Sequence, residues 1–115
     1  GEQIYAKEFS GSGLWGTIRG VLGVTADVSH TTGLSIISHN ETPGLGGRIT
    51  ENWFQRQLAG EEVPDGMLRV TDGEGDYDHQ NGEIDGITGA TRTSDSMEVI
   101  LNRELDTLKN ALGGS

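Results

Sequence analysis

The strongest pattern in this 115-residue sequence is an amphipathic segment near its C-terminal end. Its large apolar side chains recur every three or four positions, at Met97, Ile100, Leu101, Leu105, Leu108 and Leu112. That period lines them up along one stripe of an α-helix, and Asp95 followed three residues later by Glu98 is a helix-start signal. The sequence therefore predicts a C-terminal helix over 95–112 whose apolar stripe must be buried against another layer.

The first forty residues are expected to supply that layer as a sheet. Short apolar runs at 4–9, 14–24 and 34–38 predict three strands. Glycines inside the middle run predict a bent strand, or a place where a ligand or another backbone comes close. The turn sequence HTTG at 30–33 would join the last two strands as an antiparallel hairpin. Strands followed by a closing helix predict a single α+β domain over 1–115 with a curved antiparallel sheet.

A short middle helix is predicted over 51–59. Thr50 would be its N-cap and Gly60 the residue that follows its C-terminus. Ile49 and Phe54 then occupy the two positions of a hydrophobic staple, which fixes the direction from which the chain enters the helix.

The region after the middle helix is acidic and rich in glycine. A strand is predicted at 67–71, with room for one more short strand near Tyr77. The segment 72–83 resembles a calcium loop, but Tyr77 stands where the sharp turn needs glycine, so a solvated acidic loop is favoured. The histidines lack the spacing of metal ligands and no metal site is predicted: His30, His39 and His79.

Composition excludes several classes of function. The formal net charge is −10, with 18 acidic and 8 basic side chains, which disfavours nucleic acid and anionic membrane surfaces as partners. The absence of cysteine excludes thiolate catalysis, cysteine-ligated zinc, iron–sulfur clusters and disulfides. No run approaches the roughly 20 apolar residues of a membrane span.

Two glycine-rich segments are candidate ligand loops. GSGLWG at 11–16 matches the G-x-G-x-x-G pattern, but a β-rich run follows it where a dinucleotide site needs a helix, so that function is not predicted. In ETPGLGG, 41–47, Pro43 and Gly44 suit the centre of a type II turn. The flanking glycines leave this backbone open, so an ordinary turn and a ligand-facing turn both remain possible.

A third candidate is the hydroxyl-rich stretch DGITGATRTS at 85–94. It combines small residues at Gly86, Gly89 and Ala90 with four hydroxyl side chains, those of Thr88, Thr91, Thr93 and Ser94. Placed ahead of a helix, these hydroxyls, with help from Arg92, could hold a phosphate beside the free N–H groups and the positive end of the helix dipole. The alternative is that they only cap the helix.

The same segments carry a resemblance to a known family. DGITGAT at 85–91 resembles the D-G-x-(S/T)-G-A-T signature of the covalent FMN-binding domains of NqrC, from the sodium-translocating NADH:quinone reductase, and RnfG, from the Rnf complex. HNETPGLGG at 39–47 resembles that family's second hallmark, and GSGLWG is similar to the element typical of the quinone-reductase branch. The likeness extends from Gly11 to about Leu105.

The resemblance implies roles for individual residues. Thr91 would carry FMN through a phosphoester that a separate flavin transferase installs. The residues that the transferase reads would be Asp85, Gly86, Thr88, Gly89, Ala90 and Thr91. Those that bind the cofactor beside Thr91 would be Glu41, Thr42, Gly44, Leu45, Gly46, Thr88, Gly89, Ala90, Thr93 and Ser94.

The resemblance also implies a function and a location. The domain would pass electrons between other subunits of a membrane-bound, ion-translocating NADH:quinone or NAD:ferredoxin oxidoreductase, with no active site or catalytic residue of its own. It would lie on the extracytoplasmic (periplasmic) side, attached by an N-terminal membrane anchor outside this chain. The alternatives are a module that binds FMN or another phosphorylated ligand reversibly, and an acidic adhesion or structural domain.

Overall fold

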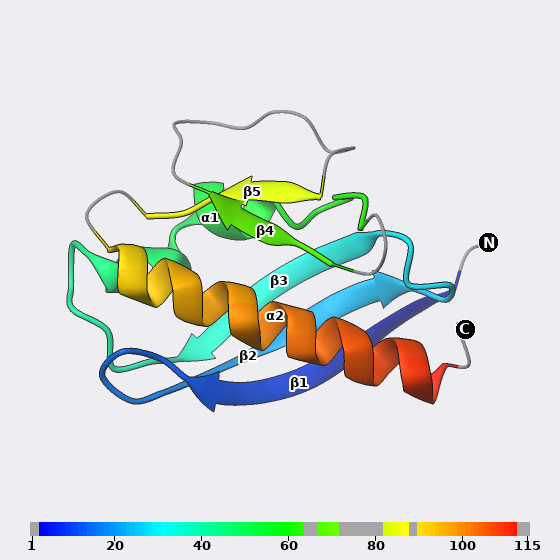
Figure 1. The fold of residues 1–115 in the computed structure, drawn as a ribbon, viewed down its shortest axis with the longest axis horizontal. Helices are drawn as coiled ribbons and strands as arrows, with labels where there is room; N and C mark the ends of the chain where they lie inside the picture. Colours follow the sequence, from blue (N-terminus) through cyan, green and yellow to red (C-terminus); the bar gives the residue numbers. More distant parts are fainter. Residues whose placement is uncertain (1–2, 64–66, 72–81, 88–89, 113–115) are drawn as a thin grey trace.

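The protein is a two-layer α+β domain, which confirms the predicted fold class (Figure 1). The computed structural model describes residues 3–63, 67–71, 82–87 and 90–112. In chain order its elements are β1 (Ile4–Ser12), β2 (Thr17–Thr25), β3 (Thr31–Ser38), the 3₁₀-helix η1 (Gly46–Thr50), α1 (Asn52–Arg56), β4 (Arg69–Thr71), β5 (Glu83–Asp85) and α2 (Thr91–Ala111). No helix in these ranges is long and apolar enough to cross a bilayer.

The larger sheet is antiparallel, with strand order β1-β2-β3. The β1–β2 ladder is continuous from Ile4 opposite Thr25 to Ser12 opposite Thr17. The β2–β3 ladder shifts register at two glycines of β2, Gly20 and Gly23. These irregularities confirm the predicted bend of the middle strand, since bulges bend a strand and increase its twist.

The hairpin between β2 and β3 is confirmed, but its turn is not the predicted HTTG. The turn lies at 26–29, and β3 already begins at Thr31. The carboxylate of Asp27 accepts hydrogen bonds from the hydroxyl of Thr25 at 2.8 Å and the backbone N–H of Ser29 at 3.1 Å. The prediction was wrong because side-chain hydrogen bonds of this kind build a turn without glycine or proline.

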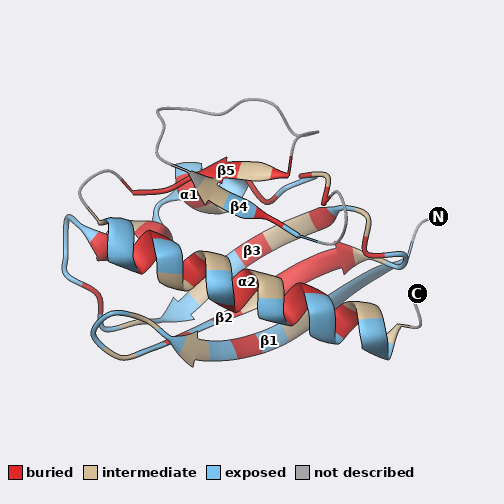
Figure 2. Ribbon diagram, in the orientation of Figure 1, coloured by how far each residue is buried: buried red, intermediate tan, exposed pale blue. Residues whose placement is uncertain are grey.

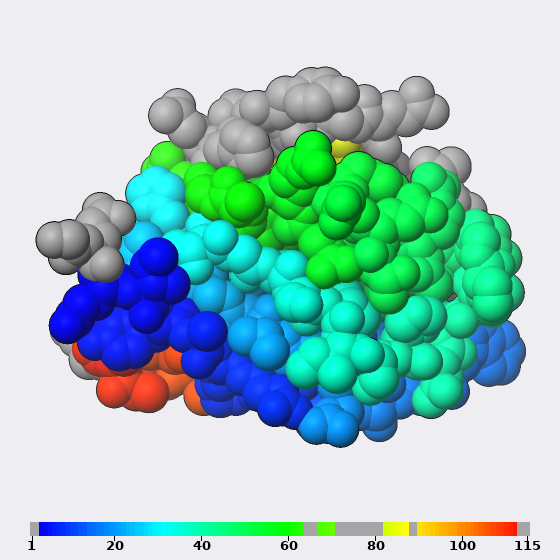
Figure 3. All heavy atoms as spheres, turned by 180° about the vertical axis from the view of Figure 1, so that it is seen from behind, coloured from blue at the N-terminus to red at the C-terminus, as the bar shows by residue number. Residues whose placement is uncertain are grey.

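Helix α2 lies across one face of the larger sheet and supplies five of the eighteen buried apolar residues in the described part of the core. Its apolar stripe is buried as predicted, at Met97, Ile100, Leu101, Leu105 and Leu108 (Figure 2). Inward side chains of the sheet complete the core, among them Phe9, Ile18, Leu22, Val24 and Leu34. The opposite face of the sheet lies at the surface, where Figure 3 shows it from behind, and it carries an ion pair between Glu8 and Arg19.

The middle helix is shorter than predicted, and a 3₁₀-helix that was not predicted precedes it. A 3₁₀ turn, η1, precedes a single five-residue α-helix, α1. Thr50 does not cap α1, because its hydroxyl donates to the carbonyl of Gly47 at 3.0 Å, and Glu51 is the N-cap residue. Ile49 and Phe54 are both fully buried, but with Glu51 as the N-cap they do not occupy the predicted staple positions. Gly60 has a φ of +92° but lies three residues beyond the C-cap, Gln57, so it is not the residue that follows the helix end.

The smaller sheet is a parallel pair, β4 and β5. The predicted strand at 67–71 is confirmed in shortened form as β4, whereas β5 was not predicted. Three-residue strands are too short to show a period in the sequence. The strand expected near Tyr77 and the acidic part of the calcium-like loop, 72–81, lie outside the described residues.

Candidate functional site

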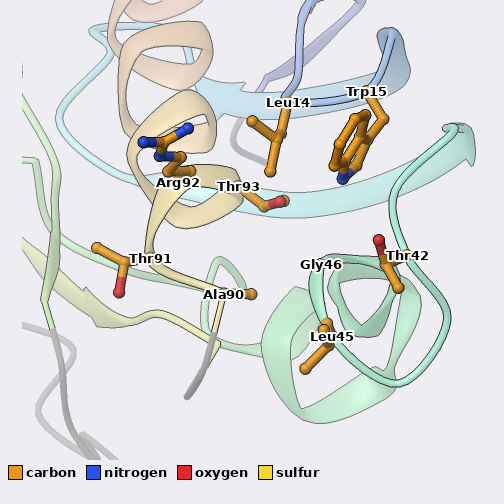
Figure 4. Close-up of a pocket in the computed structure, with 9 residues that line it drawn as sticks. All are labelled: Leu14, Trp15, Thr42, Leu45, Gly46, Ala90, Thr91, Arg92 and Thr93. Atoms are coloured by element: carbon orange, nitrogen blue, oxygen red, sulfur yellow. The ribbon is translucent and has the colours of Figure 1, made fainter.

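Three segments distant in sequence meet at one end of the larger sheet, at the left of Figure 1. They are the β1–β2 turn, the loop after β3 and the start of α2, and they enclose an open cavity of about 370 Å³. The residues that line it, drawn in Figure 4, are Leu14, Trp15, Thr42, Leu45, Gly46, Ala90, Thr91, Arg92 and Thr93. This volume is in the range of small-molecule sites, roughly 300–1,000 Å³.

The β1–β2 turn presents two large apolar side chains to the cavity. A backbone hydrogen bond from Gly13 to Gly16, 2.8 Å long, closes the turn around Leu14 and Trp15. Leu14 is 40% exposed and Trp15 is 65% exposed. Neither was among the predicted site residues, although GSGLWG had been singled out as a motif. Two exposed apolar side chains in a glycine-rich turn were the available signal.

The loop after β3 forms the second wall and contains the predicted type II turn. The carbonyl of Thr42 accepts from the N–H of Leu45 at 3.1 Å, and Gly44 has the positive φ, +77°, that the third position of this turn requires. Thr42, Leu45 and Gly46 also line the cavity, so a ligand-facing function of this turn stays a prediction. Gly44 itself is exposed and does not line it.

Glycine is required at the back of this wall. A Cβ on Gly46 would collide with the hydroxyl of Thr93 and lie 3.0 Å from the Cβ of Glu41. The loop and the helix start are therefore packed backbone against side chain.

The third wall is the start of α2, which begins four residues earlier than predicted. Thr91 is the first helical residue, so Thr91, Thr93 and Ser94 lie inside the first turn and not ahead of it. The N-cap is Ala90, which has no side-chain hydrogen bond to offer. The interpretation in which the hydroxyls merely cap the helix is therefore wrong for the threonines and serine of this turn.

The hydroxyls of the first turn have different environments. Thr93 is 2% exposed and donates to Glu41 at 2.8 Å. Ser94 is 4% exposed, accepts from the N–H of Ile87 and donates to the carbonyl of Ala90. Thr91, by contrast, is exposed. The structure thus separates one accessible hydroxyl from two that hold the fold together.

The described part of the segment before Ala90, residues 85–87, is buried. Asp85 is 4% exposed and Gly86 is buried against Ser94, whose hydroxyl would lie 2.8 Å from a Cβ placed on Gly86. The predicted transferase-recognition residues therefore divide into a buried part, Asp85 and Gly86, and an accessible part at Thr91. Thr88 and Gly89 lie outside the described residues.

Glu41 differs from its predicted position against the ligand. It is 3% exposed and lies behind the cavity wall, not among the residues that line it. Its carboxylate accepts hydrogen bonds from the N–H groups of Leu14 and Trp15 and from the hydroxyl of Thr93. Across the described ranges, no group of three His, Asp or Glu side chains is placed to hold a metal ion.

The residues that line the cavity suit a flat aromatic ligand with a phosphate tail. Leu14, Trp15 and Leu45 provide exposed apolar surface for a ring. On another side of the cavity, the start of α2 contributes backbone N–H groups and two exposed residues, Thr91 and Arg92, whose polar ends point away from Trp15 in Figure 4. An α+β domain with such a cavity at a helix start belongs to the class of small ligand-binding domains.

Comparison with known proteins is more specific. The model of the FMN-binding domain family matches residues 13–106, and the chain belongs to this family. The C subunit of the Na⁺-translocating NADH-quinone reductase of Pseudomonas aeruginosa is 34% identical in an alignment of 98 positions that covers 80% of this chain and 38% of that protein. The G subunit of the ion-translocating oxidoreductase complex of Methanosarcina acetivorans is 33% identical, over 89% of this chain and 50% of that protein.

Solved structures give the same assignment. The C subunit of the Na⁺-translocating NADH-quinone reductase from Parabacteroides distasonis superposes with a TM-score of 0.81 and 26% identity, over 100% of this chain and 59% of that one. NqrC of Shewanella oneidensis gives 0.78 and 25%, over 99% of this chain and 55% of that one. The chain thus spans between 38% and 59% of the length of these four proteins.

Proposed function

We propose that this domain carries FMN as a phosphoester on Thr91 and serves as an electron carrier. The observation that carries the proposal is that Thr91 is exposed and lines the cavity, while Thr93 and Ser94 are buried and hydrogen-bonded. Membership in the FMN-binding domain family supports the choice of ligand. The DGITGAT sequence that ends at Thr91 supports the choice of attachment residue.

Each part of the cavity has a function in this proposal. When bound, FMN would supply reversible electron transfer. Leu14, Trp15 and Leu45 would cover the ring and exclude water from it. The N–H groups of the first turn of α2 and the guanidinium of Arg92 would attract the phosphate, because a helix start and a cation both favour negative charge. We assign no catalytic residue.

The names of the relatives support a wider proposal for the full-length protein. They are subunits of the Na⁺-translocating NADH-quinone reductase and of an ion-translocating oxidoreductase complex. We propose that this domain passes electrons to or from neighbouring subunits of such a complex. It would do so on the extracytoplasmic side of the membrane, held there by an anchor outside the present chain.

The attachment is tested by mass. The chain is co-expressed with a flavin transferase, denatured and weighed. Because the oxygen of Thr91 would replace one phosphate oxygen, the expected gain is the mass of FMN less one water. Thr91→Ala should abolish this gain, whereas Thr107→Ala, which removes an exposed hydroxyl elsewhere on α2, should preserve it.

Other outcomes of this experiment discriminate between the functions. Yellow colour that is lost on denaturation would indicate reversible binding and would contradict the phosphoester. A mass gain that survives Thr91→Ala would place the flavin on another residue. The membership of a complex needs a separate measurement, which is to purify the full-length protein from its native membranes in mild detergent and identify the proteins that co-purify. Redox subunits are expected among them, and their absence would contradict the wider proposal.

A further inference from the structure

Glu41 is a buried carboxylate to which three cavity-forming segments are tied. It lies in the loop after β3 and is 3% exposed. Its Oε1 accepts from the N–H of Leu14 at 2.9 Å and from the hydroxyl of Thr93 at 2.8 Å, and its Oε2 accepts from the N–H of Trp15 at 3.0 Å. None of the ion pairs among the described residues involves Glu41. Its charge is therefore balanced by hydrogen-bond donors, which makes those three bonds individually strong.

The three donors all belong to the cavity wall. Leu14, Trp15 and Thr93 line the cavity, and Glu41 does not. The carboxylate thus lies behind the wall and joins the β1–β2 turn to the first turn of α2. Two glycines make room for it, because a Cβ on Gly13 would lie 3.0 Å from Oε1 and a Cβ on Gly46 would lie 3.0 Å from the Cβ of Glu41.

We propose that Glu41 is a positioning residue that holds Trp15 over the cavity and does not itself touch the ligand. The β1–β2 turn has only one backbone bond of its own, from Gly13 to Gly16, among the described contacts. The two bonds to Glu41 fix the turn relative to α2, on which Thr91 lies two residues from Thr93. The identity of the ligand as FMN rests on the proposed function, whereas the three bonds exist without ligand.

Neither Asp nor Gln can replace the carboxylate of Glu41. Three donors need acceptors on both oxygens of the side chain. Gln has one acceptor oxygen, and its NH₂ group would face an N–H of Leu14 or Trp15, a donor opposed to a donor. Asp is shorter by one methylene and cannot reach both the turn and Thr93. Leaving a buried donor without an acceptor is costly, so the turn should move.

The first experiment uses the protein without flavin. Amide hydrogen exchange measured by NMR should show protection at Leu14 and Trp15, and Glu41→Gln should speed exchange at one or both by roughly tenfold or more. Glu98→Gln is the matched control, because Glu98 also accepts from a backbone N–H, that of Val70, but lies away from the cavity. Unchanged exchange at both amides in Glu41→Gln would overturn the proposal.

Two substitutions of Thr93 keep the test decisive if Glu41→Gln fails to fold. Thr93→Val removes one donor while keeping the shape of the side chain, and Thr93→Ser restores that donor. Exchange at Leu14 should quicken in Thr93→Val and return toward the original rate in Thr93→Ser. Equal exchange in both variants would contradict a link between the turn and α2.

The second experiment uses the protein after treatment with the transferase. With Trp53→Phe in the background, Trp15 is the remaining tryptophan, and a flavin close to it should quench its fluorescence. Glu41→Gln should keep most of the flavin mass gain but lose at least half of this quenching. Loss of the mass gain with unchanged amide exchange would mean that Glu41 acts on the ligand directly and would overturn the proposal. If no variant acquires flavin, the proposed function fails, while the exchange data still decide the role of Glu41.

Discussion

The side-chain amide of Asn102 pairs with the backbone of Leu68 as a neighbouring strand would. Its Oδ1 accepts from the N–H of Leu68 at 2.7 Å and its Nδ2 donates to the carbonyl of Leu68 at 2.9 Å. The side-chain amide of Gln57 pairs with the backbone of Asp85 in the same way. Its Oε1 accepts from the N–H of Asp85 at 2.7 Å and its Nε2 donates to the carbonyl of Asp85 at 3.0 Å. The two strands of the small sheet are thus each extended by a side chain from a helical segment, because buried backbone groups must be paired.

Asn102→Ala should lower the free energy of unfolding by roughly 1–3 kcal/mol, because two polar groups at Leu68, a fully buried residue, lose their partners. Urea unfolding followed by circular dichroism measures this. Asn110→Ala, at an exposed position of the same helix, is the control. If Asn102→Ala lowered the free energy of unfolding no more than the control does, water would be able to replace the side-chain amide without loss of stability.

Thr91→Ser should still accept flavin from the transferase, although to a smaller extent than the original chain. The hydroxyl persists, whereas the lost methyl group gives the side chain more rotational freedom at an exposed position. The fraction of chain that gains the flavin mass in a fixed time measures the effect. A serine variant as inert as Thr91→Ala would indicate that the methyl group, and not only the oxygen, is needed.

Gly46→Ala should destabilise the domain by about 1–3 kcal/mol, since the added Cβ collides with the hydroxyl of Thr93 and crowds Glu41. Gly33→Ala is the matched control, because a Cβ there meets nothing within 4 Å. Its unfolding free energy should stay within about 0.5 kcal/mol of the original. Equal urea midpoints for the two variants would mean that Thr93 and Glu41 can shift to accommodate the added Cβ at little cost in stability.

The turn at Asp27 should make a pH-dependent contribution to stability. Hydrogen bonds from the hydroxyls of Ser29 and Thr25 lower the pKa of Asp27 from 3.8 to about 2. A lowered pKa in the folded state stabilises the fold above pH 3.8, and this contribution disappears as the pH falls through about 2. An NMR titration of the Asp27 carboxyl carbon measures the pKa directly.

The free energy of unfolding of Asp27→Asn should therefore differ most from that of the original chain near neutral pH and least near pH 2. Urea midpoints recorded across that interval give the comparison. Asp106→Asn, which removes one exposed carboxylate from α2, controls for the change in net charge. A difference between Asp27→Asn and the original chain that does not vary with pH would rule out this origin.

Features set by local sequence could be predicted. The apolar period of α2 identified the helix and its buried stripe. Pro43 and Gly44 identified the type II turn, because each fixes a backbone angle that the turn needs. The glycines of β2 identified its bend, because glycines inside a strand often mark bulges.

Features that depend on contacts between distant residues could not be predicted from the sequence. The start of α2 was placed at Asp95 because that residue carries a local start signal. The helix instead begins at Thr91, since Thr93 and Ser94 obtain partners in Glu41 and Ile87 through the fold. Glu41 and Thr93 are 52 residues apart in sequence, so their hydrogen bond leaves no local pattern. Leu14 and Trp15 bond to the same carboxylate across 27 and 26 residues, which likewise leaves no local pattern.

Helix α2 also determines how a group bound at its first residue would move. From Thr93 to Leu108 the helix is fastened to the sheet by eight buried residues. A flavin on Thr91 would therefore be attached to a helix that is packed against the rest of the domain, and not to a flexible loop. To bring the flavin nearer to a neighbouring redox centre, the domain would have to move as a rigid body. The rate of electron transfer would then depend on the segment that connects this domain to its neighbours.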